Sequence, residues 1–247
     1  MEVLNLYGLL GALVIGVVLG LTGGGGSILT VPILVYILSV NPVTATAYSL
    51  FVVGTTALFG TIRNAQKGMI EYRTAFVFSV PAFIAVYLTR KLIIPAIPDT
   101  IFTFNEFVFT KNLAVMLFFA FIMLLASVSM IRTRKEVVVK ETRIFNYPLI
   151  IIEGFVVGVL TGLVGAGGGF LIIPALVLLA GLDMKIAIGT SLVIIAMKSI
   201  IGFGGDLYQG FEVDWIFVFY VLMATTIGVL MGNYISKFFS GPQLKKF

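Results

Sequence analysis

Two glycine clusters each interrupt a strongly apolar region of the chain. The first is GGGGSILTVP at 23–32 and the second is GAGGGFLIIP at 165–174. Glycine readily adopts conformations that break a helix, and the freed N–H groups, with the positive end of a following helix, attract negative charge. The chemistry expected at these clusters is therefore the binding of a small anion by backbone amides.

Other polar residues could complete such a site. Lys198 lies inside the apolar run AIGTSLVIIAMKSIIGF, where an ionisable residue is a functional candidate, although its side chain could instead extend to the outer surface. Hydroxyl groups that follow the short runs could coordinate an anion, cap a helix or bond a neighbouring helix. The predicted substrate-binding residues are Gly24, Gly25, Gly26, Ser27, Ser49, Gly167, Gly168, Gly169, Thr190, Ser191 and Lys198.

The composition indicates an all-α membrane protein. Of the 247 residues, 60% are hydrophobic and 11% are charged, and the mean hydropathy is +1.14. Backbone groups in a bilayer must be paired internally, and the apolar runs are too long for barrel strands. The chain has no cysteine or histidine, nucleotide-binding loop or facing carboxylate pair, so we expect no metal, cofactor or enzyme activity. The basic residues do not resemble a nucleic-acid surface.

Runs of about 20 apolar residues predict long membrane spans. These spans lie near 4–22, 44–62, 74–94, 112–131, 148–164, 186–203 and 214–238, and shorter runs lie near 28–40 and 170–181. Pro32 and Pro174 could mark where a half-helix begins after an extended glycine segment, or could kink a longer helix. The glycine pairs Gly16/Gly20, Gly158/Gly162 and Gly228/Gly232 are expected to allow close helix packing.

The chain contains an internal repeat. A shift of 142 residues superposes Pro32 on Pro174 and aligns glycines on both sides of it. We therefore predict a first repeat at 1–131, a basic cytoplasmic linker at 132–147 and a second repeat at 148–247. The loop at 63–73 is basic and its counterpart at 205–215 is acidic, which indicates that the two repeats have opposite orientations.

Two topologies remain open. If each short run crosses the membrane there are nine crossings, with the N-terminus outside and the C-terminus in the cytoplasm. If the short runs are re-entrant, the acidic loop falls inside and the lysine-rich tail outside, which the positive-inside rule disfavours. Asp206 could relay a proton, but a solvated loop carboxylate is the preferred interpretation. The phenylalanine-rich segment 95–111 is expected to lie at the outer interface.

The paired motifs resemble those of the TauE/SafE family of sulfite exporters. The second repeat carries GAGGG with a proline five residues on, then AIGTS at 187–191, then GFEVD at 210–214. The first repeat is a looser match, with GGGGSILTVP, ATAYS at 45–49 and GMIEY at 68–72. The resemblance implies transport of sulfite, sulfonates or related small anions without choosing among them.

The sequence thus predicts a secondary transporter in the plasma membrane that exports a small anion, or lets it diffuse, between the glycine breaks of two inverted repeats. The alternatives are an anion uptake system, an anion channel, or a membrane scaffold that transports nothing. The expected partners are the small anionic substrate and the lipid bilayer, with no nucleic acid; a homo-oligomer remains open.

Overall fold

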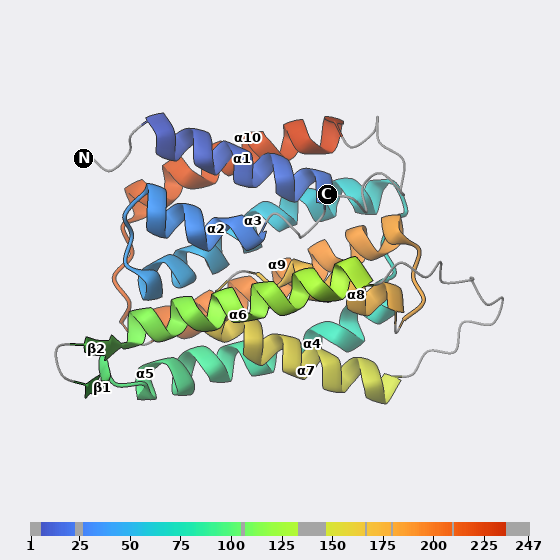
Figure 1. Cartoon of the computed structure of the whole chain (residues 1–247). Helices are drawn as coiled ribbons and strands as arrows, with labels where there is room; N and C mark the ends of the chain where they lie inside the picture. Colours follow the sequence, from blue (N-terminus) through green and yellow to red (C-terminus); the bar gives the residue numbers. More distant parts are fainter. Residues whose placement is uncertain are drawn as a thin grey trace.

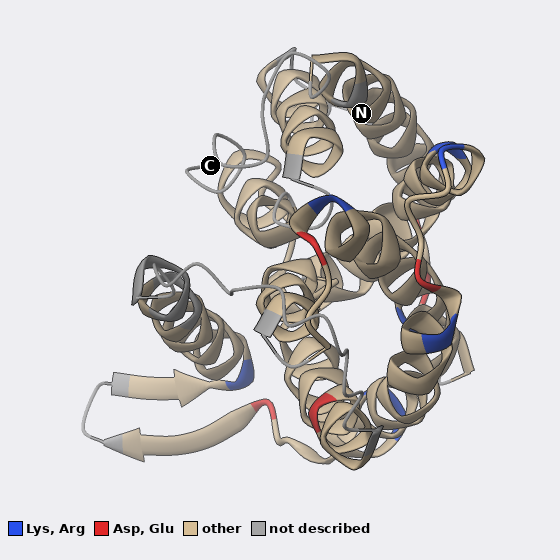
Figure 2. Ribbon diagram, turned by 90° about the vertical axis from the view of Figure 1, so that its right-hand side faces the viewer, with Lys and Arg blue, Asp and Glu red and all other residues tan. Residues whose placement is uncertain are grey.

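The fold is a bundle of helices that run along a common direction (Figure 1). The computed structural model describes residues 6–22, 27–104, 107–132, 147–165, 167–178, 180–208 and 210–235. Of these, four helical segments are long and apolar enough to cross a membrane: Pro42–Gln66, Tyr72–Ala96, Met184–Tyr208 and Trp215–Gly232. Figure 2 shows that lysine, arginine, aspartate and glutamate occupy few positions on the ribbon. The predicted helical membrane bundle is confirmed.

The helix bounds follow the predicted spans closely. The first repeat contains α1 (Leu6–Thr22), α2 (Ser27–Pro32) with the π-helix η1 (Ile33–Ile37), α3 (Pro42–Gln66), α4 (Tyr72–Leu88) with the π-helix η2 (Thr89–Ile93) and α5 (Ile94–Ala96), and α6 (Lys111–Arg132). The second contains α7 (Tyr147–Val164), α8 (Gly169–Leu178), α9 (Met184–Tyr208) and α10 (Trp215–Ile235). The agreement is close because helix length here is set locally by uninterrupted apolar sequence.

The repeat seen in the sequence is also a repeat in space. Adding 142 to the bounds of α3 gives the bounds of α9. In Figure 1 these two helices run in opposite directions, as do α1 and α7. Packing follows the same symmetry, since α1 packs along α10, α7 packs along α4, and α3 packs along α9. The structure therefore has the predicted inverted repeats, while the limits at 131 and 148 stay a prediction.

The course of the chain distinguishes the two topologies. In Figure 1, α1 and α3 run in the same direction, so α2 and η1 carry the chain back between them. This is the order of the nine-crossing topology. The bundle thus has a linker end, where α3 and α6 finish and α7 begins, and a hairpin end, where a small β-hairpin joins α5 to α6. The acidic loop between α9 and α10 lies at the hairpin end.

The prolines do not start the short helices. α2 begins at Ser27 and α8 begins at Gly169, so each proline is the sixth residue of its helix. Of the two alternatives, the half-helix that begins at the proline is wrong, because Ser27–Pro32 and Gly169–Pro174 are already helical. After Pro32 the backbone widens into η1, where the N–H of Leu38 bonds to the carbonyl of Ile33 five residues earlier.

Glycines at helix contacts explain how the helices approach so closely. A Cβ on Gly16 or Gly228 would overlap backbone atoms of the facing helix in the α1–α10 pair. A Cβ on Gly158 would lie 2.5 Å from the carbonyl oxygen of Ala82 in the α7–α4 pair. Such small residues let helix backbones touch in a membrane. The packing interpretation of these glycines is confirmed.

The segment expected at the interface forms the β-hairpin. Strands β1 (Thr100–Phe104) and β2 (Phe107–Thr110) pair antiparallel, and the rings of Phe102 and Phe109 stack with centroids 4.8 Å apart. The sequence analysis did not predict strands here. Threonine, isoleucine and phenylalanine are good strand formers, and that signal was available in TIFTF.

Candidate functional site

The second glycine cluster is a buried turn between α7 and α8. Gly165, Gly167 and Gly168 have φ angles of 72°, 64° and 67°, in the left-handed region that favours glycine. A Cβ on Gly168 would overlap Thr161, and one on Gly165 would lie 2.5 Å from the carbonyl oxygen of Thr46. The predicted helix break is therefore present in the second repeat. Gly24, Gly25 and Gly26 lie outside the described residues, between the end of α1 and the start of α2.

Lys198 meets this turn in the middle of the bundle. It is the fifteenth of the 25 residues of α9 and is fully buried, so it does not extend to the surface. Its ammonium group donates a hydrogen bond to Thr161 Oγ1 at 2.8 Å, and a Cβ on Gly168 would lie 2.8 Å from Lys198 Nζ. Within the described part of the chain, no carboxylate lies at ion-pair distance from Lys198.

Ser27 lies beside the same turn. It is the first residue of α2 and is fully buried, and a Cβ on Gly167 would be 3.3 Å from Ser27 Cβ. The start of α2 in the first repeat thus faces the turn that precedes α8 in the second. The structure brings together Ser27, Gly167, Gly168, Gly169 and Lys198 from the predicted set.

Ser49 lies between two residues of α3 that contact the turn. Thr46, Ser49 and Val53 follow helical spacing on one side of α3, and the outer two contact the turn: Thr46 at Gly165 and Val53 at Gly167. Ser49 is fully buried, and its hydroxyl has no hydrogen-bond partner among the described residues. An unpaired buried hydroxyl is costly, and a ligand in this position would satisfy it.

Thr190 and Ser191 lie elsewhere. Thr190 is eight residues from Lys198, about 12 Å along the helix, and its hydroxyl accepts a hydrogen bond from the N–H of Glu71 at 3.0 Å. The hydroxyl of Ser191 donates to the carbonyl oxygen of Ile188 at 2.8 Å. The structure therefore does not bring these two residues to Lys198, and their part in substrate binding stays a prediction.

The acidic residues of the motifs GMIEY at 68–72 and GFEVD at 210–214 act as helix caps. The Glu71 carboxylate accepts from the N–H of Thr74 at 2.6 Å, and the Asp214 carboxylate accepts from the N–H of Phe217 at 3.0 Å. Each acid caps the helix that follows it, α4 or α10. The N–H of Asp214 donates to the Tyr48 hydroxyl at 3.0 Å, and Tyr48 is the repeat counterpart of Thr190. These motifs join the two repeats at both ends.

A buried ion pair was missed by the sequence analysis. Arg90 in η2 is fully buried, its Nε lies 3.3 Å from Asp206 Oδ2, and its Nη1 donates to Thr46 Oγ1 at 3.0 Å. Asp206 is buried too, so its interpretation as a solvated loop carboxylate is wrong. Arg90 could have been recognised in the same way as Lys198, because it is an ionisable residue inside the predicted span 74–94.

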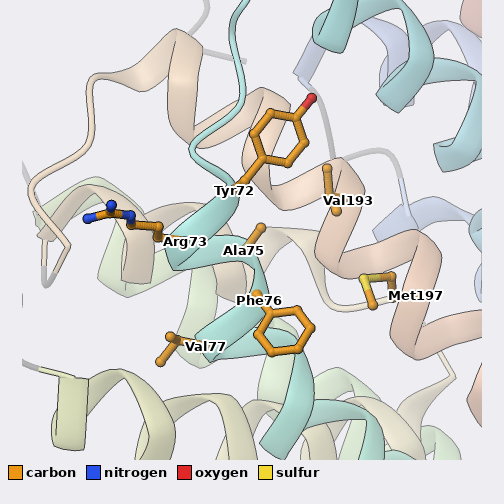
Figure 3. A pocket seen from close by; sticks show the side chains of 7 residues that line it. All are labelled: Tyr72, Arg73, Ala75, Phe76, Val77, Val193 and Met197. Atoms are coloured by element: carbon orange, nitrogen blue, oxygen red, sulfur yellow. The ribbon is translucent and has the colours of Figure 1, made fainter.

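An apolar groove of roughly 660 Å³ lies between α4 and α9, away from these residues. Figure 3 shows Tyr72 and Phe76 of α4 on one side and Val193 and Met197 of α9 on the other. Tyr72 and Phe76 are largely exposed, as expected of residues that face lipid. Lys198 follows Met197 but is not part of the lining, so the groove is separate from the glycine turn.

α6 covers the region of the short helices. Its residues Phe119 and Ile122 pack with Val31 of α2, Val164 at the end of α7 and Phe170 of α8. Those contacts exclude water from one side of the glycine turn, and a dry setting strengthens any charge interaction there.

Comparisons with known proteins point to a membrane protein. The family described as Sulfite exporter TauE/SafE matches residues 8–247. YunE of Bacillus subtilis, a probable membrane transporter protein, is 26% identical over 91% of this chain and 86% of its own length. A probable membrane transporter protein of Xylella fastidiosa is 29% identical over 76% of this chain and 68% of its own. No solved structure matches the chain. The chain belongs to the TauE/SafE sulfite exporter family of membrane transporters.

Proposed function

We propose that this protein is a secondary carrier, and not an enzyme, that exports a small oxyanion such as sulfite or a sulfonate, or lets it diffuse down its gradient. The anion is held at the glycine turn before α8, with the Lys198 ammonium group as its counter-charge. The two inverted repeats then expose it to either side of the membrane in turn.

The observation that carries the proposal is the buried ammonium group beside a glycine turn. Removing a charge from water is expensive, so buried charges are normally paired. Lys198 has the hydroxyl of Thr161 as its partner, and no carboxylate lies at ion-pair distance among the described residues. A bound anion would supply the missing negative charge.

The membrane potential favours export of an anion over its uptake. An interior negative by 100 mV favours exit of a monovalent anion by about 2.3 kcal/mol. Export therefore requires no coupled ion, whereas uptake against this potential would require one. This argument supports export or passive diffusion.

The test is a flux screen of the purified protein in proteoliposomes, with sulfite, thiosulfate, sulfate, sulfoacetate and simple carboxylates, with and without a pH gradient. We expect saturable flux with counterflow of labelled anion, which separates a carrier from a channel with large unitary currents. If the purified protein transports none of the tested anions, the scaffold alternative is favoured and the proposal is contradicted.

Lys198→Met is the decisive variant. It removes the charge but keeps an unbranched side chain of similar length, so we expect the loss of saturable flux with membrane insertion unchanged. Lys185→Met is the matched control, because Lys185 lies on the same helix and is exposed. Unchanged affinity and flux in Lys198→Met would exclude the role assigned to this residue.

A further inference from the structure

The ion pair at the hairpin end links the two repeats. Arg90 in η2 and Thr46 in α3 belong to the first repeat, and Asp206 in α9 belongs to the second. The Arg90 guanidinium group lies 3.3 Å from Asp206 through Nε and 3.0 Å from Thr46 through Nη1. Any motion of one repeat against the other at this end must change these contacts.

The fold does not require an ion pair at this position. The repeat counterparts of Asp206 and Arg90 are Asn64 and Gly232 at the linker end. The Asn64 amide donates to the carbonyl oxygen of Gly60 in its own helix, and Gly232 packs against Val17 of α1. A buried ion pair is also weak evidence of stabilisation, because desolvation offsets much of the attraction. The asymmetry between the two ends indicates a role beyond packing.

The glycine turn connects the two buried cations. At one end of the turn, Gly168 lies beside the ammonium group of Lys198; at the other, Gly165 lies against Thr46, the hydrogen-bond partner of Arg90. On α3, Ser49 lies between Thr46 and Val53, the two residues that contact the turn, and its hydroxyl has no hydrogen-bond partner among the described residues. Two positive groups, a donor hydroxyl and left-handed glycines thus follow one another towards the hairpin end.

We propose that Arg90 is a second binding position for the transported anion, which leaves Lys198, passes Ser49 and takes the place of Asp206 on the Arg90 guanidinium group. The ligand class is a small monovalent oxyanion, whose oxygens match the guanidinium donors as a carboxylate does. Asp206 closes this position when no anion occupies it. The proposal rests on the proposed function and adds the step by which the anion reaches the hairpin end.

Transport kinetics test the exchange directly, with labelled sulfite as the probe. Asp206→Asn removes the competing carboxylate, so we expect KM to fall by about fivefold to tenfold because charged partners at such sites compete strongly. The maximal rate should fall as well, since the anion leaves Arg90 more slowly. Arg90→Gln should raise KM.

A purely structural ion pair gives a different pattern. It predicts that both variants lose protein yield, thermal stability and maximal rate, while KM stays unchanged. Lys91→Gln is the control, because Lys91 is the next residue of η2 and its ammonium group lies over the ring of Tyr208. An unchanged KM in Asp206→Asn, with wild-type protein transporting sulfite normally, would overturn this inference and leave the proposed function intact.

A second measurement does not depend on flux. The chain has no native cysteine, so Ser49→Cys can be labelled with an anionic, membrane-impermeant thiol reagent. We expect slow labelling with Asp206 in place and faster labelling in Asp206→Asn, from the hairpin side only. Ser191→Cys, the repeat counterpart, should be unaffected by Asp206→Asn. Equal labelling of Ser49→Cys in both backgrounds would contradict the closing role of Asp206 even if the protein proved to transport no anion.

Discussion

Gly168 occupies a position that only glycine can take without strain. Its φ angle of 67° is unfavourable for residues with a Cβ, and the space that a Cβ would need is filled by Thr161. The absence of a side chain therefore allows the backbone to turn and allows the Lys198 ammonium group to lie close to it. Gly204 in α9 provides a contrast, because a Cβ there would meet nothing within 4 Å.

Gly168→Ala is expected to abolish or strongly reduce anion flux, because the added methyl group displaces Thr161 and Lys198. The left-handed conformation costs an alanine roughly 1–2 kcal/mol and the displaced Thr161 side chain adds to this, a loss below the roughly 5–15 kcal/mol stability of a typical folded protein. Insertion and detergent-solubilised monodispersity should therefore remain near wild type. Flux in proteoliposomes measures the effect, and Gly204→Ala is the matched control that should transport normally. Full activity of Gly168→Ala would refute the role of the turn.

Among the helices, contacts that occur in both repeats can be distinguished from polar residues that occur in only one. α1 and α10 touch through Gly16 and Gly228, and α7 and α4 touch through Gly158, so both outer pairs have the same construction. The acidic caps Glu71 and Asp214 repeat in the same way, each joined to a hydroxyl of the other repeat. These repeated contacts form the frame, whereas Lys198, Arg90 and Asp206 occur in one copy each.

Gly228→Ala should lower stability without a specific effect on substrate affinity. Its methyl group would overlap the carbonyl oxygen of Leu13, which forces α1 and α10 apart. Overpacking of this kind costs about 1–3 kcal/mol. We expect a lower Tm of the detergent-solubilised protein and an unchanged KM for sulfite in the protein that remains folded. A Tm equal to that of the wild type would show that this contact is not tight.

For the whole molecule, the two inverted repeats predict a definite orientation. The basic loop that contains Lys67 lies at the linker end and the acidic loop that contains Glu212 lies at the hairpin end. Basic loops remain in the cytoplasm, so we propose that the linker end is cytoplasmic, with the N-terminus outside and the C-terminus inside the plasma membrane.

Single cysteines test this orientation, because both Lys67 and Glu212 are exposed. In intact cells, a membrane-impermeant thiol reagent should label Glu212→Cys and should leave Lys67→Cys unlabelled until the cells are permeabilised. The cysteine-free wild type provides the background. The reverse labelling pattern would place the hairpin end in the cytoplasm. The proposed anion position at Arg90 would then open to the cytoplasm instead of the outside.

The sequence alone is enough to predict the helices, their inverted repetition and the break at the second glycine cluster. These features depend on local properties: the length of an apolar run, the conformational freedom of glycine, and the charge of a loop. It also identified Lys198 as a candidate, because a lysine within an apolar span is conspicuous in any fold. It could not choose between a buried position and one at the surface.

Which polar groups meet depends on how the helices pack in three dimensions. Lys198 reaches Thr161 and Gly168 across 30 or more residues of sequence, and Arg90 reaches Asp206 across the two repeats. Such contacts depend on the rotation of each helix about its axis and on glycine-mediated packing, which a hydropathy pattern leaves open. For the same reason, the sequence does not reveal that Thr190 and Asp206 each have a partner in the other repeat.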